Sequence, residues 1–197
     1  MKKLFALCGS PHRNGVTEKL LRGFLSYADG VAVVERFNAY EQAIQPCDAC
    51  GACQSRRGCT KTDGRDLFYS LEQSDYIVVA TPVYLLSFPA PLKAVFDRFE
   101  QYYGARFGLN LKPPVERPKK AFVIITNGSD TYDGAGIILR QSQVAFSVMN
   151  TALAGSFTMS GTDTIDDNRL SQALTELGAR AGEFFQTGQE EPWPKSI

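Results

Sequence analysis

A buried strand that turns abruptly into a helix, residues 4–17, constrains this chain most. Residues 4–8 form a short continuous apolar run, typical of a parallel strand covered on both faces. Glycine, proline and polar residues follow from Gly9 to Gly15, and from Thr17 onward apolar residues recur at helical spacing. The unpaired N–H groups at the start of a helix attract anions. The segment therefore predicts an anion site, and we expect a phosphate there.

The side chains of this loop suit a phosphate. Ser10 and Thr17 supply hydroxyl donors, and Arg13, with the neighbouring His12, supplies positive charge. Gly15 lets the backbone come close to a ligand. The segment contains neither GxGxxG nor GxxxxGK[ST]. Taken alone, the loop also fits an ordinary strand-to-helix connection with an N-cap.

Strands and helices alternate along the rest of the chain. This alternation predicts a parallel sheet with helices on both faces, and ligands bind such sheets at the carboxyl ends of the strands. We expect one domain, residues 1–197, with an oversized loop rich in cysteine at about 38–64. Further strands are expected at 31–37, 75–82, 120–127 and 152–159, and helices at 65–73, 91–103, 134–150 and 167–187.

Composition indicates which partners and which cellular compartment to expect. The chain has 21 basic and 21 acidic residues and is 44% apolar, so we expect no nucleic-acid partner. No apolar run is long enough to span a membrane, so no membrane association is expected either. The apolar run after Lys2 and Lys3 is too short for an export signal, which predicts a cytoplasmic protein.

Residues 9–17 resemble a known phosphate loop. Gly-Ser-Pro-His-Arg-Asn-Gly-Val-Thr is similar to the Gly-Ser-Pro-Arg-x-x-Gly-Asn-Thr loop of the flavodoxin-like FMN proteins, which include NAD(P)H-dependent FMN reductases and iron–sulfur flavoproteins. His12 stands where that pattern has Arg, and Val16 stands where it often has Asn. The resemblance implies a flavodoxin-like α/β fold: a doubly wound five-stranded parallel sheet in the order 2-1-3-4-5, within three α/β/α layers.

Two further loops resemble the same family. The apolar and aromatic segment after the third strand suits a flat ring that needs a few hydrogen bonds. It resembles the family's Pro-Val-Tyr loop, and residues 92–98 resemble its Leu-Lys-x-x-x-Asp-Arg helix. The alternative is that Tyr84 and Phe88 are core aromatic residues. The resemblance implies FMN contacts from Ser10, His12, Arg13, Asn14, Gly15, Thr17, Pro82, Val83, Tyr84, Leu85, Asn127, Gly128 and Ser129.

Four of the five cysteines lie close together, at Cys47, Cys50, Cys53 and Cys59. Such Cys-x-x-Cys spacing lets neighbouring thiolates surround one metal centre. The motif resembles that of the iron–sulfur flavoproteins, which implies that all four bind a 4Fe–4S cluster. A zinc ion, a metal-free loop lining the active site, or a disulfide are the alternatives. Cys8 lies in the first strand and is assigned to the core.

The resemblance implies an FMN-dependent oxidoreductase that takes NAD(P)H as co-substrate and reduces a quinone, a nitro compound, a flavin or another small acceptor. Because the flavin performs the chemistry, no catalytic acid or base is expected. The alternative is an iron–sulfur flavoprotein that exchanges electrons with ferredoxin through the cysteine cluster. A third interpretation is a flavin-free regulatory module of the same fold. By analogy, we expect a homodimer or a homotetramer.

Overall fold

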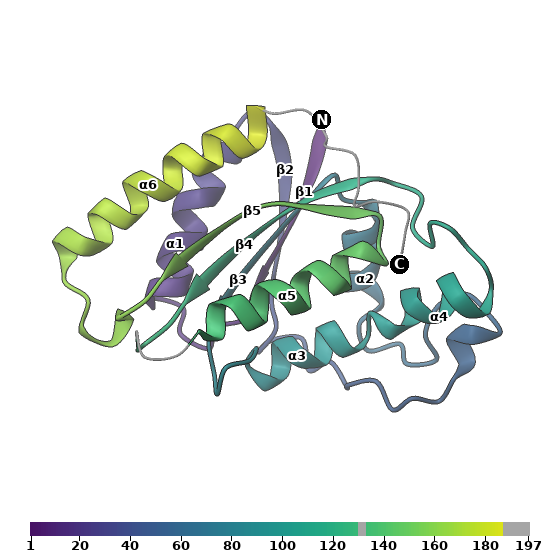
Figure 1. Cartoon of the computed structure of the whole chain (residues 1–197). Helices are drawn as coiled ribbons and strands as arrows, with labels where there is room; N and C mark the ends of the chain where they lie inside the picture. The colour runs from purple at the N-terminus through teal and green to yellow at the C-terminus, as the bar shows by residue number, and fades with distance from the viewer. Residues whose placement is uncertain (130–132, 187–197) are drawn as a thin grey trace.

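The computed structural model describes residues 1–129 and 133–186. Its centre is a parallel five-stranded sheet in the order β2-β1-β3-β4-β5, which confirms the predicted fold class (Figure 1). The strands are β1 Lys2–Cys8, β2 Ala32–Asn38, β3 Tyr76–Pro82, β4 Lys119–Thr126 and β5 Thr151–Met159.

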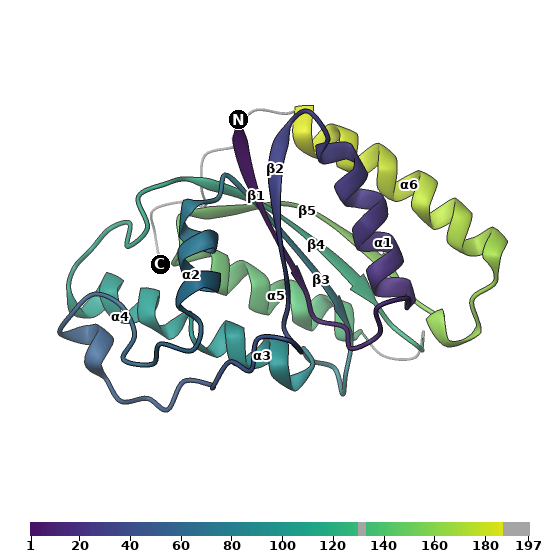
Figure 2. The ribbon, with the colours of Figure 1, turned by 180° about the vertical axis from the view of Figure 1, so that it is seen from behind.

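Helices cover both faces of the sheet. Helices α1 and α6 lie on one face, and α2, α3, α4 and α5 lie on the other (Figures 1 and 2). Among the described residues, no helix is both long enough and apolar enough to cross a lipid bilayer. Thr187, the predicted last residue of the final helix, lies outside the described residues. The helices are α1 Val16–Leu25, α2 Arg65–Gln73, α3 Ala90–Asp97, α4 Glu100–Gly108, α5 Gly134–Ser147 and α6 Asp167–Gln186.

The apolar runs of the strands are explained by burial on both sides. In β1, Leu4 and Cys8 pack toward α1 and α6, whereas Phe5 and Leu7 pack toward α2 and α3. Successive side chains of a strand point to opposite faces, so a doubly covered strand needs no polar positions. Burial raises the pKa of the Cys8 thiol to about 11. Cys8 is therefore a core residue, as predicted.

The single helix expected at 91–103 was wrong. The chain forms two helices there, and between them hydrogen bonds run from residue i to i−3: the Phe99 N–H donates to Phe96 at 3.0 Å and the Tyr102 N–H to Phe99 at 2.9 Å. Such bonds tighten the last turn of a helix. No glycine or proline marks the break, so no local signal in the sequence predicts it. Arg98 lies in this turn and is 1% exposed.

Asp75 lies at the amino edge of the sheet, where the parallel strands begin, and joins the starts of the central strands. Its carboxylate accepts the Lys3 N–H at 2.9 Å, the Lys2 ammonium at 3.3 Å and the Arg117 guanidinium at 3.0 Å. Burial raises the pKa of Asp75, but the Lys3 N–H and the two cations outweigh it, so the pKa lies below its usual value. The charged carboxylate is thus the form that the fold stabilises.

We expect Asp75→Asn to lower the free energy of unfolding at pH ~7 by about 1–3 kcal/mol, because three donors lose a charged acceptor that is itself buried. The carboxylate's contribution is complete above its unfolded pKa of about 3.9 and is lost as the pH falls through the lower folded pKa. Urea unfolding between pH ~7 and ~2 should therefore show a difference between the two proteins that is constant down to about pH 4 and shrinks below it. A difference that stays constant down to pH ~2, or an equal loss in the exposed control Asp29→Asn, would contradict this role.

Candidate functional site

The three loops that follow β1, β3 and β4 meet at the carboxyl edge of the sheet. The Gly9 N–H donates to the Ala80 carbonyl at 2.7 Å, which joins the first loop to the end of β3. The Val83 N–H donates to the Thr126 carbonyl at 2.8 Å, and the Thr126 hydroxyl lies 2.7 Å from the Thr17 hydroxyl. The loops predicted to bind FMN are therefore in direct contact with one another.

The first loop leaves the N-terminus of α1 open. The helix begins at Val16 after Gly15, and no side chain caps it. The buried Ser10 accepts the His12 N–H on its Oγ at 3.2 Å, and the Gly15 N–H donates to the His12 carbonyl at 3.0 Å. These two bonds fold the loop back so that the first turn of α1 is not blocked. The uncapped N–H groups fit a phosphate.

Positive charge lies beside this helix end. His12, Arg13 and Asn14 are all exposed, and the Arg13 guanidinium donates to the Glu41 carboxylate at 2.8 Å. The two side chains are 78% and 50% exposed, and an ion pair in such a setting contributes at most about 1 kcal/mol. Arg13 can therefore exchange the carboxylate for a phosphate at low cost.

One buried carboxylate near the phosphate loop was missed by the sequence analysis. Glu18 lies in the first turn of α1 and is bound by Arg36 at 2.5 Å and Arg22 at 2.8 Å. Burial raises the pKa of Glu18, but the hydrogen bonds from the two arginines outweigh it and lower the pKa. The spacing of four residues between Glu18 and Arg22 was a signal for one of these pairs.

The second loop ends in a tight turn. The N–H and carbonyl groups of Tyr84 and Ser87 exchange two hydrogen bonds, each 2.9 Å long. Between them, Leu85 and Leu86 have positive φ angles of 48° and 62°, and Leu85 is wholly exposed. A non-glycine residue in this region costs about 1–3 kcal/mol, and such residues cluster at functional sites. The turn therefore presents an exposed apolar tip at the carboxyl edge of the sheet.

The two aromatic residues of this loop have different surroundings. Phe88 is 4% exposed and stacks on Phe96 with ring centroids 4.2 Å apart, so it belongs to the core. Tyr84 is 44% exposed. Pro82 ends β3, and Val83 packs partly against the core below. Tyr84 is thus the aromatic side chain that this loop leaves open to a ligand.

The third loop is braced by the end of β5. The Asn127 N–H donates to the Met159 carbonyl at 2.8 Å, and the Thr162 N–H donates to the Asn127 carbonyl at 3.1 Å. A Cβ atom on Gly128 would lie 2.5 Å from the carboxylate of the exposed Asp163, so a larger residue there would require the Asp163 side chain to move. Ser129 follows in the same turn.

The three loops together have the features of a flavin nucleotide site. The uncapped amides of α1, an arginine and a neighbouring apolar loop fit the phosphate and the ring of FMN.

All four clustered cysteines line one cavity of about 220 Å³. The cavity lies between the β2–α2 loop and the start of α4, and the loop's 3₁₀ helix η2, Ala52–Gln54, packs against α4. A Cβ atom on Gly104 would lie 2.6 Å from the Cys53 Sγ, so glycine allows this close approach. Residues that are close in sequence thus face one shared space.

The thiols are not arranged as a closed ligand set. The Cys50 Sγ lies 3.6 Å from the Thr60 hydroxyl, and the Cys53 thiol donates to the Glu100 carbonyl at 3.6 Å. Burial raises the pKa of Cys53, and the other three cysteines raise it further. Within residues 1–129 and 133–186, no three Cys, His, Asp or Glu side chains are placed to hold a metal ion. The donor types fit a thiolate-bound metal, and the cluster stays a prediction.

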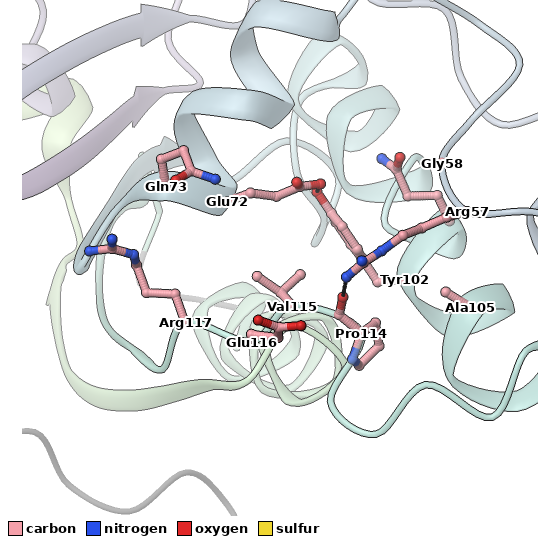
Figure 3. Close-up of a pocket in the computed structure, with 11 residues that line it drawn as sticks. Arg57, Gly58, Glu72, Gln73, Tyr102, Ala105, Pro114, Val115, Glu116 and Arg117 are labelled. Atoms are coloured by element: carbon pink, nitrogen blue, oxygen red, sulfur yellow. Dashed lines mark hydrogen bonds between the residues drawn. The ribbon is translucent and has the colours of Figure 1, made fainter.

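A larger cavity, of about 860 Å³, is lined by Arg57 and Gly58 of the β2–α2 loop together with residues of α2, α4 and the segment before β4 (Figure 3). The Arg57 guanidinium donates to the Pro114 carbonyl at 2.6 Å, which joins the β2–α2 loop to the segment before β4 at this cavity. The Tyr102 hydroxyl donates to Glu72 at 3.0 Å. Burial, and then the charge of Glu72, raise the pKa of Tyr102 well above its usual value. None of the three loops that follow β1, β3 and β4 lines this cavity.

Known proteins resemble the chain in sequence. It is 37% identical over 113 residues to an iron–sulfur flavoprotein of Methanosarcina thermophila, an alignment that covers 56% of this chain and 59% of the relative. A second iron–sulfur flavoprotein, of Archaeoglobus fulgidus, is 31% identical over 51% of this chain and 46% of its own length. The chain thus spans about half to three fifths of these curated relatives.

Solved structures share its fold. An azoreductase from Bacillus anthracis superposes with a TM-score of 0.69 at 15% identity, over 93% of this chain and 100% of that one. An NAD(P)H:quinone oxidoreductase from Methanothermobacter marburgensis gives 0.66 at 17% identity, over 95% and 98%. At such low identity the likeness extends to the fold alone.

The family model of NADPH-dependent FMN reductases matches residues 2–163. This match covers β1 to β5 and all three loops of the carboxyl edge. Because it spans most of the chain, the chain belongs to the NADPH-dependent FMN reductase family.

Proposed function

We propose that this protein binds FMN at the carboxyl edge of its sheet and transfers a hydride from NAD(P)H to a small acceptor such as a quinone, a nitro compound or a free flavin. The observation that carries the proposal is the contact of three loops beside an uncapped helix N-terminus. The family match supports the flavin, and the donor and acceptor are our inference.

Different residues of the carboxyl edge would hold different parts of the cofactor. The amides that begin α1, the Ser10 hydroxyl and Arg13 would bind the phosphate. The exposed Tyr84 and the turn at Leu85 would lie along the ring and exclude water from it. FMN, when bound, supplies the redox chemistry, so the chain itself needs no acid or base. Backbone groups of residues 127–129 would orient the polar edge of the ring.

Arg13→Ala is expected to weaken FMN binding about tenfold to hundredfold, because a charge-assisted hydrogen bond to the phosphate is lost. Glu41→Ala removes the carboxylate that competes for the same guanidinium, so it should leave the affinity unchanged or raise it. The measurement is quenching of FMN fluorescence on titration with each protein.

Equal weakening by both variants would contradict the role given to Arg13. If the unmodified protein left FMN fluorescence unchanged, the proposed function would fall and the flavin-free regulatory module would stand. A flavin that binds but is not bleached by NADPH or NADH would overturn the hydride donor alone.

A second candidate function rests on the cysteines. The four thiols line one cavity, and curated relatives bear the name iron–sulfur flavoprotein. We propose as the alternative that Cys47, Cys50, Cys53 and Cys59 bind an iron–sulfur cluster. In this role the protein would pass single electrons between ferredoxin and FMN.

The absorption spectrum of anaerobically purified protein separates the two candidates. A broad iron–sulfur shoulder that is lost in Cys50→Ala but kept in Cys8→Ala would support the electron carrier. Flavin bands alone, bleached by NAD(P)H in both variants, would support the reductase. Iron and zinc analysis of the same samples checks the ligand set, because zinc also accepts four thiolates but adds no visible band.

We also propose that a second copy of the chain covers the flavin edge. Leu85 is wholly exposed, and Tyr84 and Leu86 beside it are 44% and 40% exposed. An apolar turn of this kind is typical of a surface that a partner buries. Leu85→Asp should shift sedimentation from dimer or tetramer toward monomer. The exposed control Val33→Asp, on the edge strand β2, should not.

A further inference from the structure

The loop between β2 and α2 needs an explanation for its fixed shape. It spans residues 39–64, and its one regular element is the short helix η2. Four of its residues, Ala43, Ala49, Gly51 and Gly58, have positive φ angles, which regular structure does not supply. A loop of this length without regular structure must be held by side chains.

The two ends of this loop are joined at one place, which we name the loop neck (Gln45, Lys61 and Asp63). The Gln45 N–H donates to the Asp63 carboxylate at 2.5 Å. The Arg98 guanidinium donates to the Gln45 carbonyl at 3.1 Å, to the Lys61 carbonyl at 2.9 Å and to Asp63 at 2.7 Å. The neck thus closes the loop two residues before Cys47 and two residues after Cys59.

Arg98 occupies a position that only a strong constraint explains. Its side chain is 1% exposed and lies over the Phe68 ring at 5.5 Å. A buried guanidinium is costly, and its pairing with Asp63 and two carbonyl groups offsets that cost. Its Nε is buried with no hydrogen-bond partner among the described residues, and the side chain lines the cysteine cavity itself.

The geometry requires arginine and not merely a positive charge. The guanidinium is planar, and two of its nitrogens reach acceptors on opposite ends of the loop. A lysine ammonium is a single point on a flexible stem and cannot hold both ends in one plane. The break between α3 and α4 is what places this side chain under the neck.

We propose that Arg98 is a positioning residue that closes the cysteine loop at its neck and thereby holds Cys47, Cys50, Cys53 and Cys59 around one cavity. Only one part of this inference, the effect on metal binding by the four cysteines, rests on the proposed function. The closure of the loop is a property of the chain without any metal.

The test uses the full chain with FMN added, as unmodified protein, Arg98→Lys, Asp63→Asn and the control Arg106→Lys. Arg106 is also an arginine with a buried Nε that has no partner in the described structure, but it donates to Ser147 on α5 instead of the loop. Two readouts are taken without metal: hydrogen exchange of residues 45–63, and labelling of each thiol by N-ethylmaleimide, followed by mass spectrometry.

Arg98→Lys should speed exchange across residues 45–63 and labelling of the partly buried Cys47, Cys53 and Cys59 about tenfold to hundredfold, because the neck opens. The exposed Cys50 should label at nearly the same rate in all four proteins. Asp63→Asn keeps two of the three bonds and should give a smaller increase. Arg106→Lys should match the unmodified protein. Labelling rates in Arg98→Lys equal to those of Arg106→Lys would overturn the proposal. If Arg98→Lys fails to fold, Asp63→Asn alone decides, since no change there contradicts the neck.

Zinc titration of the reduced proteins forms the second arm. Residues that orient metal ligands typically change metal affinity about tenfold to hundredfold, so Arg98→Lys should weaken zinc binding by that factor. If the unmodified chain binds neither zinc nor iron, the electron-carrier function fails while the exchange data still test the neck. If FMN binds equally well to all four proteins, the flavin site and the neck are separate features.

Discussion

Thr126, the last residue of β4, holds the loops at the carboxyl edge of the sheet together. Its carbonyl accepts the amide of Val83 from the second loop, and its hydroxyl meets Thr17 at the start of α1. These contacts exist because parallel pairing places the ends of β1, β3 and β4 in register at one edge. A shift in the register of any of these strands would separate the loop after β1, proposed to bind the phosphate, from the loop after β3, proposed to bind the ring.

Helix α3 connects this edge to the cysteine loop. It begins at Ala90, directly after the loop that follows β3, and ends at Asp97, next to Arg98, which binds the loop neck. A helix of eight residues spans about 12 Å, so the two places are linked by one short rigid element. The buried stack of Phe88 on Phe96 fixes this helix against the core. The geometry of the proposed flavin site and of the thiol cavity is therefore set by the same piece of chain.

Much of the fold could be predicted from the sequence, because the signals were local. The apolar run of β1, the helix at Arg65–Gln73 and the order of the elements are all written in residue type and spacing. The sequence missed the break at Arg98, where neither glycine nor proline interrupts the helical pattern. It also missed the pairing of Glu18 with Arg36, because those residues lie on different elements. The proposed FMN and metal contacts remain predictions.

The sequence by itself determined the fold class, the family and the residue types available at each loop. Those properties depend on apolar periodicity and on short motifs, which a linear pattern carries in full. Tertiary structure alone decided which loops touch, which arginine binds which carbonyl, and that four thiols share one cavity. These facts depend on contacts between residues far apart in the chain, and such contacts exist only once the sheet has set the register and the helices have packed on it.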